Sequence, residues 1–294
     1  MFGGGGGIGN FLTSNQSGIA TTWAAGLNYN DVWSKKTSVS GSYFFNSMNT
    51  NNDNDNYKET FVTNDSSQYN TSTTKSNNKN TNQRFNFEID QKIDSFNSIL
   101  IRPTFSNQHT DNFSETTSFL TKGKLTNLSG VQQKNSTISD GYNFNTRAAR
   151  LEGFTQFQFR YQKVDFYLAQ EYAATSYQRE GLYKNGIYPI NSFGKSPIIR
   201  FENFGFKSGL TWKLSGKQLL LFNGSHASKA PNLRAVFPNS RINNTIVDGI
   251  ESETNSSLDA NYVYRSPKLK MRLTGYYSQI KKATENSFFY AEGI

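Results

Sequence analysis

The stretch from 256 to 278 constrains the fold more than any other, because apolar and polar residues alternate along both of its halves. In the second half, one face of an extended chain is apolar and consists of Leu269, Met271, Leu273, Gly275 and Tyr277. The opposite face is mostly polar and consists of Lys268, Lys270, Arg272, Thr274, Tyr276 and Ser278. A period of two residues is that of a β-strand. The pattern therefore predicts a strand with one apolar and one polar face.

The first half of the stretch alternates in the same way and predicts the other arm of a hairpin. Its apolar face holds Leu258, Ala260, Tyr262 and Tyr264. Its other face holds Ser257, Asp259, Asn261 and Val263. A tight turn over 265–268 would pair Tyr264 with Leu269, and this register brings both apolar faces to the same side.

The polar face of this hairpin indicates the environment of the sheet. It carries Lys268, Lys270 and Arg272 close together, and unpaired charges of this kind would be costly inside a soluble sandwich core. Each arm is close to the roughly 9–11 residues with which a tilted strand crosses a bilayer. An apolar outer face, a polar inner face and aromatic residues near the ends are typical of an outer-membrane β-barrel wall.

The composition favours strands and polar loops over a large soluble core. Of the 294 residues, only 35% are hydrophobic, and the mean hydropathy is -0.67. Aromatic residues make up much of the apolar content, with 24 Phe and 16 Tyr. No run of about 18 apolar residues is present, so the sequence predicts no membrane-spanning helix. A search for continuous apolar runs does not detect barrel strands, because about half of the residues in such a strand are polar.

Several classes of function find no support in the residues. The chain has no cysteine, which removes disulfides, thiolate metal sites and cysteine nucleophiles. His109 and His226 are far apart and have no acidic companion at metal-ligand spacing. No paired carboxylates or nucleophile–base pair point to catalysis, so we expect neither an enzyme nor a cofactor. The net charge of +9 is scattered through the chain, which argues against nucleic acid as a partner. Asp259 and Arg272 share a face and could form a pair lining a lumen.

The start of the chain differs from the rest in composition. Residues 1–18 are rich in glycine and are expected to form a loop, whereas 19–294 hold the strand patterns. The start lacks the basic and apolar regions of a secretory signal. Because an outer-membrane protein must be exported, we expect the chain to be an internal piece of a longer precursor.

Five hairpins with short turns can be traced along the chain. Their arms are expected at 19–33 and 37–45, 84–93 and 97–105, 145–161 and 164–172, 204–214 and 218–224, and 256–264 and 268–278. The long polar tract at 46–83 is expected to be either disordered or a large surface loop, with room for a short strand at 57–63, and the tract at 107–142 is expected to be a loop. Short turns at one end and long connections at the other are typical of outer-membrane barrels. The sequence thus predicts an all-β fold, an antiparallel meander of about ten strands that forms part of a transmembrane barrel wall, open at its two edges.

The second half of the chain, from about 150 to 294, contains motifs that resemble a known family. They are the runs 229–234 (KAPNLR), 251–253 (ESE) and 271–277 (MRLTGYY), together with loop-like runs at 179–186 and 191–196. These stretches resemble the TonB-dependent receptors of the Bacteroidota type. In that family a basic residue and a proline open a long loop, a glutamate precedes the next strand, and a strand similar to 271–277 follows.

The first half resembles a related architecture. The runs 26–31 (GLNYND) and 84–90 (RFNFEID) look like large outer-membrane barrels that carry a carboxypeptidase-like domain ahead of a plug. The resemblance implies a barrel of about 22 strands with a plugged lumen, of which this chain would supply part of the wall. Because the resemblance changes near 145–150, we expect a junction there.

An aromatic and basic loop is expected from 177 to 195, and it is the best candidate for ligand contact. Aromatic rings offer stacking area, and cations could meet an anionic or sugar-like ligand. The candidate residues are Tyr177, Arg179, Tyr183, Lys184, Tyr188 and Lys195. Trp23, Trp212, Tyr262 and Tyr264 are expected near strand ends as membrane-interface anchors.

Three functions remain open from the sequence. The resemblance implies a receptor barrel in the outer membrane that takes up an unknown small ligand, driven by the TonB complex through a plug outside this chain. The second is a non-transporting barrel or surface adhesin that binds a partner through its long loops. The third is a soluble carbohydrate-binding β protein.

Overall fold

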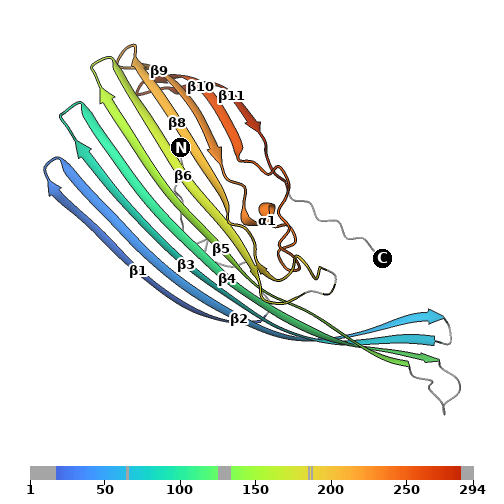
Figure 1. Ribbon diagram of the computed structural model, residues 1–294. Helices are drawn as coiled ribbons and strands as arrows, with labels where there is room; N and C mark the ends of the chain where they lie inside the picture. Colours follow the sequence, from blue (N-terminus) through green and yellow to red (C-terminus); the bar gives the residue numbers. More distant parts are fainter. Residues whose placement is uncertain (1–17, 64–65, 125–133, 185, 187, 286–294) are drawn as a thin grey trace. The chain divides into compact units, whose positions relative to one another are not determined.

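The computed structural model describes residues 18–63, 66–124, 134–184, 186 and 188–285, and most of this part is β-structure (Figure 1). The predicted glycine-rich loop therefore lies outside the described residues, except for Gly18. No helix in the described part has the length and apolar character needed to span a membrane.

The strands run through one sheet in chain order, which confirms the predicted antiparallel meander (Figure 1). Ten strands form the path of the sheet: β1 (Ile19–Ser34), β2 (Thr37–Thr63), β3 (Ser66–Lys92), β4 (Asn97–Lys124), β5 (Lys134–Arg160), β6 (Val164–Gly181), β8 (Ile199–Lys213), β9 (Gln218–Lys229), β10 (Glu253–Arg265) and β11 (Lys270–Lys281). The short strand β7 (Gly194–Lys195) pairs with β6 off this path. The one helix in the described part, α1 (Leu233–Val236), lies between β9 and β10.

The sheet is open, as the sequence predicted. Its order begins at β1 and ends at β11, and no pairing within the described residues joins these two strands. All five short turns of the predicted hairpins connect strands that are neighbours in the sheet.

The predicted register of the last hairpin is wrong by two residues. Tyr264 lies opposite Met271 instead of Leu269, and Arg265 lies opposite Lys270. The turn is displaced because Ser266 closes it: its backbone N–H donates to the carbonyl of Leu269 at 2.8 Å, and its hydroxyl accepts from the Leu269 N–H at 3.0 Å. Pro267, which has no N–H to lose, follows Ser266 as is usual in such turns. A shift of two keeps every side chain on its predicted face.

The interpretation of the long polar tracts as loops is wrong. The described residues of tract 46–83 belong to β2 and β3, with the expected short strand at 57–63 inside β2, and most of tract 107–142 belongs to β4 and β5. Polar side chains join these strands laterally. The amide of Asn77 donates to Asn49 at 2.8 Å and to Asn51 at 2.6 Å, and the amide of Asn78 donates to Asn112 at 2.8 Å. Such cross-strand pairs stabilise a sheet without an apolar face.

The chain divides into two compact units. Unit 1 comprises 1–22, 48–79 and 111–143, and therefore holds the polar strand segments. Unit 2 comprises 23–47, 80–110 and 144–294, and holds the strand segments next to the short turns.

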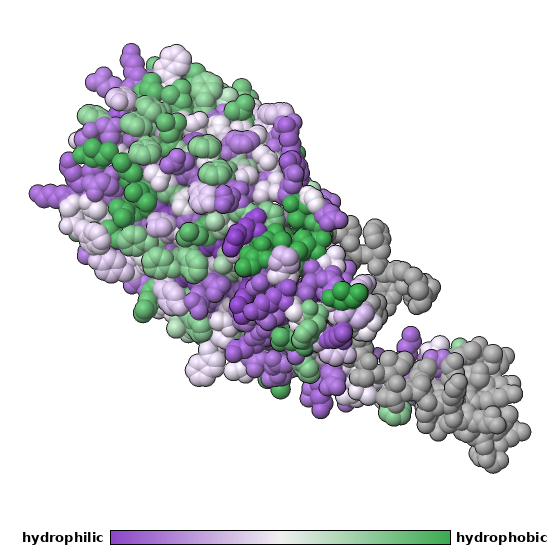
Figure 2. All heavy atoms as spheres, viewed as in Figure 1, coloured by the Kyte–Doolittle hydropathy of each residue, from purple (hydrophilic) through white to green (hydrophobic). Residues whose placement is uncertain are grey.

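Unit 2 has exposed apolar residues on one sheet face and buried polar residues on the other. On β10, Leu258 is 63% exposed, whereas Asn261 is 2% exposed. On β8, Phe204 and Phe206 are exposed, whereas Asn203, on the opposite face of the strand, is 2% exposed. We call these the outward and inward faces. Figure 2 shows hydrophobic residues lying at the surface of the molecule among hydrophilic ones. A soluble sheet has the reverse arrangement.

A small apolar core covers part of the inward face of unit 2. Val236 and Phe237 are fully buried and pack with Phe201 of β8 and Ala230. Asn232 begins α1, and its side-chain oxygen accepts from the N–H of Ala235 at 2.8 Å. The segment between β9 and β10 is thereby fixed against β8.

Candidate functional site

The predicted ligand-contact residues lie at the end of β6 and in the segment that follows. Tyr177 and Arg179 are strand residues, so their expected placement in a loop is wrong. Tyr183, Lys184 and Tyr188 lie in the connection between β6 and β7, and Lys195 lies in β7.

Arg179 is the largest fully buried side chain of the described part, at 1% exposure. Its Nε donates to the carbonyl of Ser240 at 2.5 Å, and its Nη1 donates to the carbonyl of Ser192 at 3.3 Å and to Asn244 Oδ1. The guanidinium therefore joins β6 to two connections that are distant in sequence.

The guanidinium of Arg179 remains charged although, within the described residues, no carboxylate is among its hydrogen-bond acceptors. Burial lowers the pKa of Arg179 to about 10, which leaves it protonated at neutral pH. The ring of Phe144 lies 5.1 Å from the guanidinium carbon, close enough for a cation–π contact. In the part of the chain that the structure describes, carbonyl and amide oxygens and an aromatic ring surround the charge in place of a carboxylate.

Two glycines allow the connection after β6 to approach Arg179. A Cβ at Gly181 would collide with the carbonyl of Ser192 and lie 2.9 Å from Arg179 Nη1. Gly194 has a φ of 87°, a conformation that favours glycine. The loop that includes Ser192 can therefore close over the guanidinium.

Asn244 is a positioning residue that the sequence did not reveal. Its Nδ2 donates to the carbonyl of Gly194 at 3.1 Å, and its backbone N–H donates to the carbonyl of Asn191 at 2.7 Å. The side chain of Asn191 in turn donates to Thr245 Oγ1 at 3.0 Å. In an asparagine-rich chain, no local signal distinguishes this residue from the others.

Tyr177 also makes its contacts within the protein. Its hydroxyl donates to the carbonyl of Pro231 at 3.0 Å, and its ring centre lies 6.2 Å from that of Phe201. Burial raises the pKa of the Tyr177 hydroxyl, so it stays neutral and keeps its proton for this bond. Tyr177 therefore attaches β6 to the segment that carries α1.

The other four predicted residues are exposed. Tyr183 and Tyr188 keep 47% and 38% of their surface accessible, and Lys184 is also exposed. Lys195 Nζ lies 3.9 Å from Glu180 Oε1, with its side chain 58% exposed. The segment therefore presents two phenol rings and two cations on a base fixed by Arg179 and Asn244.

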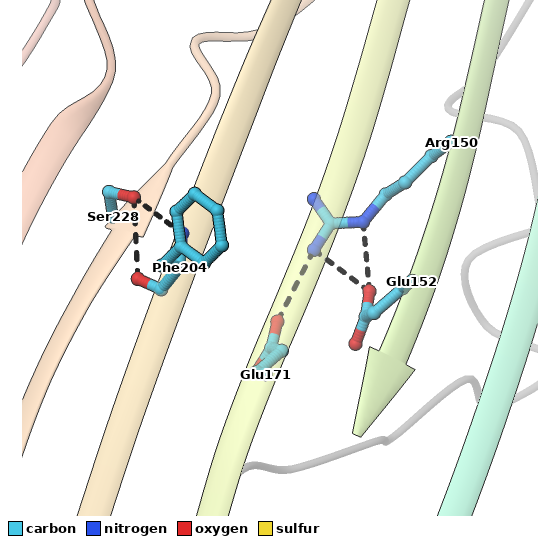
Figure 3. Close-up of polar contacts among 5 residues, drawn as sticks. All are labelled: Arg150, Glu152, Glu171, Phe204 and Ser228. Atoms are coloured by element: carbon cyan, nitrogen blue, oxygen red, sulfur yellow. Dashed lines mark hydrogen bonds and ion pairs between the residues drawn. The ribbon is translucent and has the colours of Figure 1, made fainter. Parts of the chain in front are cut away.

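The inward face of the strands carries charged networks. In Figure 3, Arg150 lies between two carboxylates, at 2.8 Å from Glu152 Oε2 and 3.7 Å from Glu171 Oε1. Lys213 Nζ donates to Asp165 at 2.7 Å.

Figure 3 also shows how the ladder between β8 and β9 ends. The pairing of the two strands stops at Gly205 and Ala227, and one residue further the Ser228 hydroxyl accepts from the backbone N–H of Phe204 and donates to its carbonyl.

Asp259 and Arg272 share the inward face as expected, but Asn261 connects them. Arg272 Nε donates to Asn261 Oδ1 at 2.9 Å, and the Asn261 amide donates to Asp259. Asn223 donates to the same carboxylate at 2.9 Å. Within the described residues, no three His, Asp or Glu side chains are grouped to hold a metal ion. The face suits a polar lining more than a reaction centre.

Neither a protein-family model nor a curated protein matches the sequence. Solved structures show a likeness in strand arrangement. The ferric citrate transporter FecA aligns over 89% of this chain and 34% of its own, at 7% identity and a TM-score of 0.48. The outer membrane receptor FauA from Bordetella pertussis aligns over 89% of this chain and 44% of its own, at 8% identity and a TM-score of 0.37. The NalP translocator domain from Neisseria meningitidis aligns over 92% of this chain and 90% of its own, at 10% identity and a TM-score of 0.28. The chain spans less than half of FecA and FauA.

Proposed function

We propose that the chain forms part of the wall of an outer-membrane β-barrel receptor that takes up a small ligand. The observation that carries the proposal is the reversed burial of unit 2, in which Leu258 and Leu273 are 63% and 69% exposed while Asn203 and Asn261 are 2% exposed. In water such a face would be a large apolar liability. In a bilayer it is the surface that contacts lipid.

Aromatic residues at both ends of the outward face support this orientation. Trp212, Tyr262 and Tyr264 lie near the short turns, and Trp212 is 46% exposed. Toward the opposite end, the rings of Tyr172 and Phe204 lie 5.0 Å apart. Aromatic girdles at both membrane interfaces are a feature of outer-membrane barrels.

The charged inward face supports a water-filled lumen. Arg150, Asp165 and Lys213 all lie on strands and have polar partners on the same face. A polar barrel interior is compatible with passage of a hydrophilic ligand. Uptake would be driven by the TonB complex through a plug, which we assign to a part of the protein outside this chain.

The exposed segment after β6 is the ligand-contact region of this proposal. Tyr183 and Tyr188 would stack on the ligand, and Lys184 and Lys195 would attract an anionic or sugar-like group. Arg179 and Tyr177 would hold the segment in place, since both make their contacts within the protein.

The orientation of the wall can be tested by placing a charge on either face of β11. Leu273→Arg should cost about 2–4 kcal/mol of folding free energy in a bilayer, because an outward arginine must enter hydrocarbon. Thr274→Arg should cost about 1 kcal/mol, since it loses only the hydrogen bond to Asn261 on the inward face. Folding titrations of the chain into lipid vesicles would measure both. Equal costs would reject the orientation.

A further inference from the structure

The outward face of unit 2 contains a groove where two cross-strand pairs consist of small residues. Ser208 of β8 lies opposite Gly224 of β9, and Ala260 of β10 lies opposite Gly275 of β11. The outward positions around these pairs are large. They include Leu168, Phe206, Leu210, Phe222, Leu258 and Tyr277.

Two adjoining cavities occupy this groove. The first has a volume of about 680 Å³ and extends from Ser208 and Gly224 to Ala260 and Gly275. The second has a volume of about 540 Å³ and extends from the same Ser208 and Gly224 toward Phe206 and His226. Both volumes fall within the roughly 300–1,000 Å³ of small-molecule sites. The two cavities share Leu168, so they form one continuous apolar groove.

The groove has a polar end, on the side away from the short turns. His226 Nδ1 lies 2.8 Å from the Ser256 hydroxyl, and Gln279 lies opposite Ser256 on β11. Lys281 is the next outward residue of β11 and is exposed. Beyond Phe204 on β8, the outward charges are those of Arg200 and Glu202.

We propose that this groove binds an acyl chain of lipid A, the phosphorylated glycolipid of the outer leaflet, with a phosphate near His226 and Lys281. The inference rests on the proposed function, which places the outward face in lipid. In outer-membrane barrels the short turns face the periplasm, so we place the opposite end of the strands, with His226 and Lys281, in the outer leaflet. The groove is continuous with that lipid-facing surface. An acyl chain is flexible enough to follow its floor, and leaving the space empty would lose the dispersion contacts of the surrounding side chains.

Two outward glycines offer a matched test: Gly275 in the groove and Gly153 on β5 outside it. A Cβ added at either glycine would meet no atom within 4 Å, so both positions have room for a larger side chain. Gly275→Leu fills the groove, whereas Gly153→Leu adds the same side chain elsewhere. The probe is lipid A added to the full chain in detergent micelles, with bound lipid counted by native mass spectrometry. Gly275→Leu should weaken the tightest binding about tenfold. Gly153→Leu should leave it unchanged.

A separate variant tests whether the phosphate lies near Lys281. Lys281→Gln should weaken lipid A binding severalfold without changing the folding of the chain into vesicles, because the lysine is exposed at the end of the groove. Phosphatidylglycerol serves as the comparison lipid and should bind more weakly than lipid A.

The outcomes separate this inference from the proposed function. Equal lipid A binding by both leucine variants, or equal affinity for phosphatidylglycerol, would overturn the groove assignment and leave the wall orientation intact. A failure of the wall itself would appear instead as equal costs of Leu273→Arg and Thr274→Arg.

Discussion

The strand segments of units 1 and 2 are both extended, but different side-chain chemistry stabilises them. In unit 1, cross-strand hydrogen bonds connect neighbouring strands, such as Thr73 to Asp55 at 2.7 Å and Thr74 to Thr116 at 2.9 Å. In unit 2, large apolar side chains cover one face, and rings such as Phe159 and Phe166 stack at 4.5 Å. The first arrangement suits water on both faces of the sheet, and the second requires an apolar solvent on one.

The difference shows that strand length and membrane span are separate properties. β2 and β3 each have 27 residues, more than twice the roughly 9–11 that cross a bilayer. Only the segments with an apolar outward face would lie in lipid. The asparagine-rich remainder continues as sheet because its amides bond across strands.

The largest expected effect of a single change in unit 2 is that of Arg179→Met. The substitution keeps much of the side-chain volume but leaves the carbonyls of Ser192 and Ser240 and the amide oxygen of Asn244 without their donor. Each unpaired buried acceptor costs about 1–3 kcal/mol, so protection of 191–196 and 240–245 against hydrogen exchange should fall by about 3 kcal/mol or more. Hydrogen exchange followed by mass spectrometry would measure this change.

Lys184→Glu is the control for Arg179→Met, because Lys184 is exposed on the same segment. Hydrogen exchange of 191–196 and 240–245 should be the same in Lys184→Glu as in the unchanged chain. Binding of an anionic probe, trigalacturonate, should nevertheless weaken, since the variant reverses a charge of the proposed contact region. Loss of protection in Lys184→Glu, or its retention in Arg179→Met, would contradict the positioning role of Arg179.

A smaller effect is expected in unit 1 from Asn77→Ala. The variant loses the amide that bonds both Asn49 and Asn51, and partly exposed hydrogen bonds contribute about 1 kcal/mol each. The two bonds together contribute about 2 kcal/mol, so exchange of the backbone amides in 48–52 and 75–79 should accelerate by roughly thirtyfold, at about 1.4 kcal/mol per factor of ten. Lys75→Ala, on the same face of β3, is the control and should change exchange little. Equal acceleration by the two variants would show that the amide pairs do not stabilise these strands.

Much of the fold could be predicted from the sequence where alternation is strong. The five short turns and the outward positions of residues such as Leu258 and Leu273 follow from a period of two. The polar tracts could not be recognised as strands, because asparagine is rare in strands and its cross-strand bonds depend on partners distant in sequence. The predicted register of the last hairpin was wrong because Ser266 forms hydrogen bonds with Leu269 inside the turn, and the alternation of apolar and polar residues does not determine where a turn closes.

The site was predictable only in part. Exposed aromatic and basic residues marked the segment after β6, and four of them are exposed in the structure. The burial of Arg179 depends on carbonyls contributed from 192 and 240, which no local pattern reveals. Asn244 is likewise defined by its contacts with Gly194 and Asn191 alone.

The most direct test of the central claim is a spin-label scan along β10 in lipid vesicles, for which the cysteine-free chain is a suitable background. Single cysteines would replace the outward residues Leu258, Ala260 and Tyr262 and the inward residues Asp259, Asn261 and Val263. Labels at the outward positions should be relaxed more by oxygen, which concentrates in lipid. Labels at the inward positions should be relaxed more by a water-soluble nickel chelate, giving a period of two. Accessibility without alternation, or with the opposite phase, would contradict the lipid-facing wall.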